Sequence, residues 1–149
     1  MAGTRTVTVN HVGQCVSDLD RSRAFYESVF GFRAVRELQV PDVAAPLLQL
    51  TPPLGMTALY LEQDGFVLEL IHFADAPMVD AGDRVMNQSG LTHLSFGVED
   101  LDEAMAAVRA GGGVVLDDTN VGVAVFARDP DGQLLELLTV WKKPTGATA

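Results

Sequence analysis

GLTHLSFGVEDLDEAMAAV, residues 90–108, decides the fold because it predicts a strand, a turn and a helix in succession. Side chains alternate along its first half, so His93 shares a face with small or polar neighbours while Phe96 points to the opposite, apolar face. Asp100 is placed to cap the helix, and Glu103 stands three residues later as the reciprocal partner. The stretch therefore predicts a His-bearing strand whose apolar face is covered by the helix that follows it.

An earlier part of the chain repeats this pattern. The matched segments are NHVGQCVSDLD at 10–20 with THLSFGVEDLD at 92–102, and DGFVLELI at 64–71 with DGQLLELL at 131–138. His11 lies 82 positions before His93, and Glu69 lies 67 positions before Glu136. Internal repetition of this length indicates two copies of a unit that begins with a His strand and ends with a Glu strand.

Each copy is expected to fold as βαβββ. Strands are predicted at 4–16, 32–40, 57–62 and 65–73 and again at 91–98, 114–117, 121–127 and 133–141, with one helix from Ser17 or Asp18 to Gly31 and another after Asp100. The offsets of 82 and 67 differ by 15 residues, and this excess falls in the proline-rich segment VPDVAAPLLQLTPPLGM at 40–56. We expect that segment to be a loop that lines or covers a pocket.

Composition limits what the copies can build. With 149 residues, 48% of them hydrophobic and 20% charged, the chain is expected to form one compact domain. No apolar run is long enough for a membrane span, and we expect no signal peptide because a strand pattern starts almost at once. The net charge of −10 argues against nucleic acid as a partner. A single Cys excludes an internal disulfide, which favours a cytoplasmic location.

The candidate chemistry lies in the repeated His and Glu residues. Glu69 and Glu136 each lie between two leucines in an otherwise apolar strand, where a carboxylate is costly unless it is paired, hydrogen-bonded or bound to a metal. We predict that His11, Glu69, His93 and Glu136 converge on one divalent cation, namely Ni, Co, Zn, Fe or Mn. Four ligands on an octahedral ion leave two positions for two neighbouring oxygens of a small-molecule substrate. A metal-free pocket is the alternative.

At these residues the chain resembles the vicinal oxygen chelate superfamily, which includes glyoxalase I, extradiol dioxygenases and bleomycin-resistance proteins. The matching motifs are NHVGQCVSDLDRSRAFYESVFGF, GLTHLSFGVEDLDEAMAAV and FARDPDGQLLELL. The resemblance implies an α+β fold in which two βαβββ modules, at about 5–73 and 90–141, form an open barrel-like cup around a metal. It implies a single domain over residues 1–149 with a frayed tail at 142–149, and commonly a homodimer.

Position 69 separates activities within that family. A glutamate there resembles glyoxalase I, whereas extradiol dioxygenases are similar to a two-His, one-carboxylate arrangement and methylmalonyl-CoA epimerases usually have Gln. The implied function is a metal-dependent lyase or isomerase in which Glu136 or Glu69 moves a proton next to a carbonyl through an enediolate. An extradiol-type dioxygenase and a non-catalytic drug- or metabolite-binding protein are the alternatives. The chain departs from typical lactoylglutathione lyases after Leu70, and no glutathione-binding set is recognisable.

Other residues are weaker candidates for the site. Cys15 is expected to be a small core residue, His72 to be structural on the face opposite Glu69, and Phe96 and Trp141 to pack rather than to stack on a substrate. Arg33, Arg36 and Arg128 are candidates for binding a substrate anion, although solvated edges are the usual place for such residues.

Overall fold

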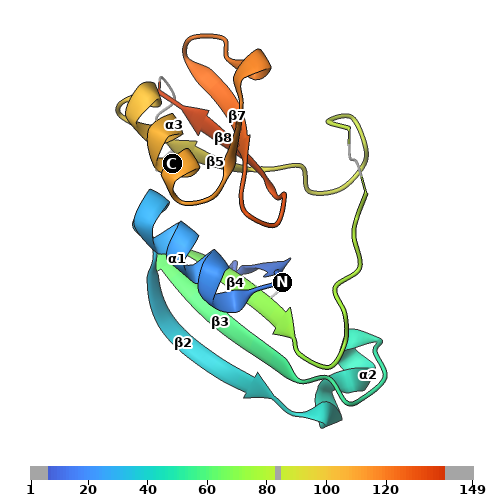
Figure 1. The fold of residues 1–149 in the computed structure, drawn as a ribbon. Helices are drawn as coiled ribbons and strands as arrows, with labels where there is room; N and C mark the ends of the chain where they lie inside the picture. Colours follow the sequence, from blue (N-terminus) through green and yellow to red (C-terminus); the bar gives the residue numbers. More distant parts are fainter. Residues whose placement is uncertain (1–6, 83–84, 140–149) are drawn as a thin grey trace, which may run out of the picture. The chain divides into compact units, whose positions relative to one another are not determined.

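The computed structural model describes residues 7–82 and 85–139, and its main features are two four-stranded β-sheets (Figure 1). In chain order the elements are β1 (Val12–Cys15), α1 (Leu19–Phe30), β2 (Arg33–Val40), η1 (Asp42–Ala44), α2 (Ala45–Leu48), β3 (Met56–Gln63), β4 (Phe66–Phe73), β5 (Leu94–Gly97), α3 (Leu101–Ala110), β6 (Val114–Leu116), η2 (Asp117–Thr119), β7 (Ala124–Arg128) and β8 (Leu134–Leu138). None of the helices in the described segments is both long and apolar enough to cross a lipid bilayer.

The two sheets have the same topology. Their strand orders are β1-β4-β3-β2 and β5-β8-β7-β6, and in each sheet the first strand of the copy runs parallel to the last. The remaining pairings are antiparallel, and in each copy a helix connects the first strand to the second. The predicted α+β class and the repeated βαβββ order are therefore confirmed, while the barrel-like cup stays a prediction.

The chain forms two compact units that do not follow the repeat. Unit 1 contains β1 to β4 with α2, whereas unit 2 contains the segment Asp20–Phe32 together with everything from β5 onward. Helix α1 is encoded in the first copy but is part of the second unit. The single domain predicted over residues 1–149 stays a prediction, and its tail lies outside the described residues.

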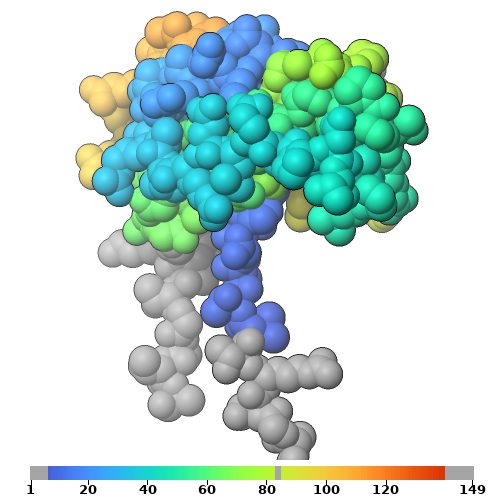
Figure 2. Space-filling model, turned by 90° about the horizontal axis from the view of Figure 1, so that it is seen from below, coloured from blue at the N-terminus to red at the C-terminus, as the bar shows by residue number. Residues whose placement is uncertain are grey.

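In unit 1, the inserted segment packs on the sheet. Ala45 and Leu54 form a buried cluster with Met56 and Ala58 of β3, and the Asp42 carboxylate accepts a hydrogen bond of 2.9 Å from the backbone N–H of Leu54. Its prolines allow only two short helices, as expected. Figure 2 shows the atoms of β2 and of this segment next to one another on the surface of the unit. Since Ala58 and Glu69 point to the same side of the sheet, the segment covers part of the face that carries Glu69.

In unit 2, helices α1 and α3 both pack on the apolar sheet face. The rings of Phe30 and Phe96 stack with their centroids 3.8 Å apart, which confirms the packing role of Phe96. The predicted cap is also confirmed, because the Asp100 carboxylate accepts a 2.9 Å hydrogen bond from the backbone N–H of Glu103. A Cβ atom at Gly111 would lie 2.8 Å from a Val29 methyl group, so the glycine permits the close approach of the two helices.

Several predicted strands are shorter in the structure. Of the strand predicted at 4–16, β1 forms Val12–Cys15, and the described residues 7–11 lie outside a strand because they bury nothing: Val9 is 94% exposed. Residues 4–6 lie outside the described part of the chain. Strand β5 spans only Leu94–Gly97, and β7 begins at Ala124 because Gly122, with φ of 86°, makes a turn. Strand β8 ends at Leu138, and Trp141 lies outside the described residues.

The core placement predicted for Cys15 is wrong. Its side chain is exposed, while its neighbours Gln14 and Val16 are buried. The reason is the alternation of β1, which points residues 13 and 15 to the more open side of the sheet.

Candidate functional site

In unit 1, the parallel pairing of β1 with β4 brings His11 to Glu69. His11 directly precedes β1, and Glu69 lies opposite Gly13 in the register of the two strands. The His11 Nε2 atom is 3.0 Å from the Glu69 Oε2 atom, and the Glu69 side chain is 11% exposed. A Cβ atom at Gly13 would lie 3.3 Å from the same carboxylate oxygen, so the missing side chain leaves room for the pair.

Two further residues orient this pair. The Asn10 amide oxygen is 2.6 Å from His11 Nδ1, and since that oxygen can only accept, Nδ1 is the donor. Nε2 is then the ring nitrogen that faces the carboxylate oxygen, and either a proton on Nε2 or a bound cation would join these two atoms. Tyr60, directly opposite Glu69 across β3 and β4, donates a 2.7 Å hydrogen bond from its hydroxyl to Glu69 Oε1.

Tyr60 also packs on the imidazole. Its ring meets that of His11 edge-on, with centroids 5.5 Å apart. The hydrogen bond to Glu69, and secondarily burial, raise the pKa of the Tyr60 hydroxyl above its ordinary value. The phenol therefore keeps its proton and remains a donor to the carboxylate.

In unit 2, the same arrangement forms from the second copy. His93 directly precedes β5, Glu136 lies in β8, and their Nε2 and Oε2 atoms are 3.6 Å apart with both side chains 26% exposed. The Thr92 hydroxyl is 2.9 Å from His93 Nδ1, and the Ser95 hydroxyl donates a 2.6 Å hydrogen bond to Glu136 Oε2. Phe126, opposite Glu136 across β7 and β8, meets the imidazole edge-on at 5.5 Å.

Each unit therefore supplies two of the four predicted ligands. His11 lies beside Glu69 in unit 1 and His93 beside Glu136 in unit 2. Within the described part of either unit, no group of three or more His, Cys, Asp or Glu side chains is placed to hold a metal ion. The four-residue cation site stays a prediction.

The weaker candidates take mostly structural positions. Arg33 forms a 3.0 Å ion pair with Glu62, and Arg128 donates to the Gly132 carbonyl oxygen. His72 lies on the face opposite Glu69, as predicted. Arg36 lies opposite Tyr60 in the β2–β3 register, on the side of the sheet that carries Glu69.

Sequence reasoning missed the residues that orient the pairs: Asn10, Tyr60, Thr92 and the hydroxyl of Ser95. A signal for Tyr60 was present. The two-residue turn at Asp64 and Gly65 sets the hairpin register, and counting back from that turn places Tyr60 opposite Glu69.

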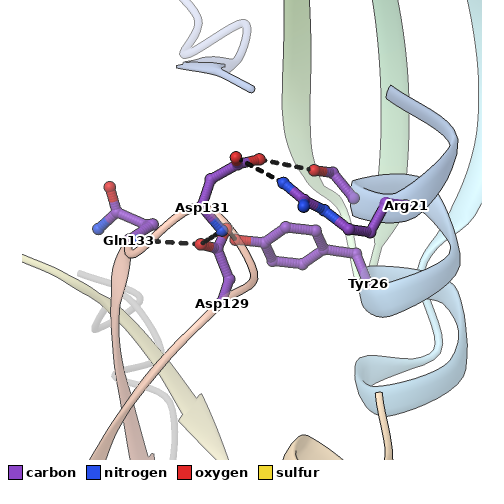
Figure 3. Close-up of polar contacts among 6 residues, drawn as sticks. Arg21, Tyr26, Asp129, Asp131 and Gln133 are labelled. Carbon is purple, nitrogen blue, oxygen red and sulfur yellow. Dashed lines mark hydrogen bonds and ion pairs between the residues drawn. The ribbon is translucent and has the colours of Figure 1, made fainter. Parts of the chain in front are cut away.

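A polar network in unit 2 fixes the turn that leads into the Glu136 strand (Figure 3). The buried Asp129 carboxylate accepts hydrogen bonds of 2.9 Å from the backbone N–H groups of Asp131 and Gln133 and from the Tyr26 hydroxyl. Asp131 accepts from Arg21 at 2.8 Å and from Ser22 at 3.1 Å, both on α1. The network ties α1 to the β7–β8 turn and so holds the start of β8 in place.

Known proteins resemble the chain over most of its length. Lactoylglutathione lyase of Haemophilus influenzae is 30% identical over 128 residues, covering 83% of this chain and 85% of that protein. Lactoylglutathione lyase GLX1 of Arabidopsis thaliana is 30% identical over 135 residues, or 86% of this chain, which spans only 42% of the plant protein. The trypanothione-dependent glyoxalase I of Leishmania major matches in structure with a TM-score of 0.65 and 26% identity, covering 90% of this chain and 87% of that one.

The family assignment rests on the sequence profile. Residues 8–137, which include all four candidate ligands and all but the last residue of the two sheets, match the profile of the Glyoxalase/Bleomycin resistance protein/Dioxygenase superfamily. The resemblance noted in the sequence is thereby confirmed, and the chain belongs to the Glyoxalase/Bleomycin resistance protein/Dioxygenase superfamily.

Proposed function

We propose that the chain is a divalent-metal-dependent lyase or isomerase of the glyoxalase I type, in which His11, Glu69, His93 and Glu136 bind one cation. The observation that carries this proposal is the repeated His–Glu pair: each copy places an imidazole beside a carboxylate at matching positions in its sheet. Packing alone does not explain this duplication, since a buried or half-buried carboxylate in an apolar strand is costly without a partner.

The donor set fits a divalent ion. Imidazole nitrogen and carboxylate oxygen suit Ni, Co, Zn, Fe or Mn, and the contact of His11 Nδ1 with Asn10 leaves Nε2 as the ring nitrogen that would bind the ion. When bound, such an ion would polarise two neighbouring substrate oxygens and stabilise the charge that develops when the carbon beside them loses its proton.

The two carboxylates are suited to different roles. Both oxygens of Glu69 are engaged, Oε1 by the Tyr60 hydroxyl and Oε2 by the His11 ring. Glu136 is more exposed, and its Oε1 accepts no hydrogen bond from the described residues. We therefore assign Glu69 as a fixed ligand and Glu136 as the general base that accepts the substrate proton.

Elemental analysis of protein purified without added metal tests the site. We expect close to one divalent ion per chain, and a loss of that ion in Glu69→Gln. The matched control is Glu37→Gln, which changes an exposed glutamate on β2 of the same sheet and should leave the metal content unchanged. Absence of metal from the wild-type protein, even after reconstitution, would exclude the proposal.

Turnover tests the reaction. Lactoylglutathione is the first compound to assay, because relatives of the chain are named lactoylglutathione lyase. Exchange of a substrate proton with deuterated water reports the proton transfer directly. We expect Glu136→Gln to lower kcat by about 10²-fold to 10⁴-fold, the usual contribution of a general base. Metal binding without turnover on any small α-hydroxy or α-keto carbonyl compound would favour a binding protein instead. A homodimer and a cytoplasmic location belong to the same proposal.

A further inference from the structure

The two copies supply a hydroxyl group to their glutamate from different strands. In copy one the donor is Tyr60 on β3, whereas the equivalent residue of copy two, opposite Glu136, is Phe126 and has no hydroxyl. In copy two the donor is Ser95 on β5, and the position matching it in copy one is Gly13. An aromatic ring is kept edge-on to the histidine in both copies, and only the hydroxyl has moved.

We propose that Tyr60 and Ser95 are positioning residues that orient the carboxylates of Glu69 and Glu136 for cation binding. This inference deepens the proposed function and rests on it. Each hydroxyl fixes the rotation of one carboxylate, so that an oxygen faces the neighbouring imidazole before any ligand binds.

The two donors act on different oxygens. Tyr60 binds Oε1 of Glu69 and leaves Oε2 to face His11, so the oxygen used for a cation is not shared. Ser95 binds Oε2 of Glu136, which is the oxygen nearer to His93, so that oxygen is shared and Oε1 is left open. The Tyr60 hydroxyl should therefore contribute more to affinity for a cation than the Ser95 hydroxyl does.

The repeat itself provides the test. Tyr60→Phe removes the donor from copy one and makes that position equal to Phe126 of copy two. Adding Gly13→Ser should then return a hydroxyl from β1, as Ser95 supplies it from β5. A Cβ there would lie 3.3 Å from Oε2 of Glu69 and from Cδ1 of Ile71, so a side chain fits only if these two side-chain ends move by a few tenths of an ångström. Tyr60→Phe with Gly13→Ala is the matched control, since it adds a methyl group without a hydroxyl.

The first readout is the affinity of the metal-free protein for Mn²⁺ and Zn²⁺, measured by titration calorimetry. We expect Tyr60→Phe to weaken binding about 10-fold, the lower end of the range for residues that support a metal ligand. Gly13→Ser should restore only part of the affinity in the Tyr60→Phe background, because its hydroxyl lies beside Oε2, the oxygen that faces His11, and Gly13→Ala should restore none. Equal affinities in the wild type and Tyr60→Phe, or equal rescue by serine and alanine, would overturn the inference.

The second readout needs no metal. The ¹³C resonance of the Glu69 carboxyl group, recorded in the metal-free protein, should move in Tyr60→Phe and return in Tyr60→Phe with Gly13→Ser. An unmoved resonance would contradict the positioning role. This readout separates the two proposals: a wild type that binds no metal removes the proposed function, while the carboxyl resonance still decides whether Tyr60 orients Glu69.

Copy two gives the reciprocal experiment. Ser95→Ala should move the Glu136 carboxyl resonance, and adding Phe126→Tyr should restore it because a hydroxyl then reaches from β7, as Tyr60 does from β3. Failure of Phe126→Tyr, with the fold intact by circular dichroism, would show that the two copies do not use equivalent donors.

Discussion

Asn10 and Thr92 each precede a site histidine by one position and place an oxygen against its Nδ1 atom, at 2.6 Å and 2.9 Å. An amide oxygen only accepts, whereas a hydroxyl both donates and accepts, so Asn10 requires a proton on Nδ1 of His11 and Thr92 does not require one on Nδ1 of His93. The His11–Glu69 and His93–Glu136 pairs therefore have a similar layout, but the position of the proton on Nδ1 is more restricted in the first pair.

Asn10→Ala should weaken metal binding because the His11 ring loses the acceptor that orients it with Nε2 toward Glu69. We expect about a 10-fold loss of affinity, as is typical for the removal of a group that supports a metal-ligating histidine. Titration calorimetry with Zn²⁺ measures it, and Thr8→Ala, an exposed change two positions earlier, is the control. An affinity equal to that of the control would show that Asn10 has no part in the site.

The candidate ligands were predictable from the repeat alone, whereas the residues that orient them were not. The repeat identified His11, Glu69, His93 and Glu136 because both copies keep the same residue types at these positions. Tyr60 and Ser95 were not identified as site residues because each occurs in one copy only. A comparison of the two copies marks only the residues that both copies keep. Which side chains touch depends on strand register, and a comparison of the two copies does not contain that information.

At the scale of elements, the β3–β4 hairpin depends on the turn that the sequence signalled. Asp64 and Gly65 have φ of 50° and 75°, and the Glu62 carboxylate accepts a 2.8 Å hydrogen bond from the Gly65 backbone N–H and one of 3.0 Å from Arg33. These bonds, the one from Gly65 first, lower the pKa of Glu62 below its ordinary value. A lowered carboxyl pKa stabilises the fold above the unfolded-state pKa, and that stabilisation is lost as the pH falls.

Glu62→Gln should therefore be destabilising at pH 7 and nearly neutral in acid. The urea midpoints of the wild type and the variant are expected to differ at pH 7 and to converge as the pH falls through the lowered pKa of Glu62, where the wild-type carboxyl also loses its charge. A difference that stays constant between pH 7 and pH 3 would mean that the charge of Glu62 does not stabilise the turn.

The β7–β8 turn is the second turn that specific hydrogen bonds hold in place. Tyr26 is fully buried, and its hydroxyl donates to Asp129, which also accepts from two backbone N–H groups of the turn. Tyr26→Phe should lower the free energy of unfolding by about 1 to 2 kcal/mol, since a buried charge-assisted hydrogen bond is lost. Urea unfolding followed by circular dichroism measures this change.

The matched control for that variant is Arg21→Ala. The Arg21 side chain is 46% exposed, and it forms an ion pair with Asp131 in the same network. Its removal should cost less than about 1 kcal/mol, because solvent screens the Arg21 end of the pair and Asp131, whose side chain is 6% exposed, keeps the hydrogen bond from Ser22. A larger loss for Arg21→Ala than for Tyr26→Phe would contradict the view that the buried Asp129 is the centre of the network.

At the scale of the whole molecule, the chain passes between the two units three times. It leaves unit 1 at Asp20, returns at Arg33, and leaves again after Pro77. The sequence predicted the helices and most strands but not this assignment of α1. Apolar spacing shows that a helix has a buried face, and it does not show which sheet covers that face.

Because the chain alternates between them, the two units should unfold together. We expect the slowest amide exchange in β4 of unit 1 and β8 of unit 2 to report the same free energy, and Tyr26→Phe to lower both by the same amount. Hydrogen exchange followed by mass spectrometry measures each strand separately. If the variant sped exchange in β8 and left β4 unchanged, the units would be independent in stability.

The use of Tyr60 as the hydroxyl donor in one copy and of Ser95 in the other bears on how the two halves of a duplicated chain diverge in sequence. After duplication, either copy tolerates the loss of one donor once a second hydroxyl reaches the same carboxylate from another strand. Selection then preserves the hydrogen bond to the carboxylate rather than the residue type at one position. An alignment of the two halves would score both positions as variable, although both copies have the same requirement for a hydroxyl donor to the carboxylate.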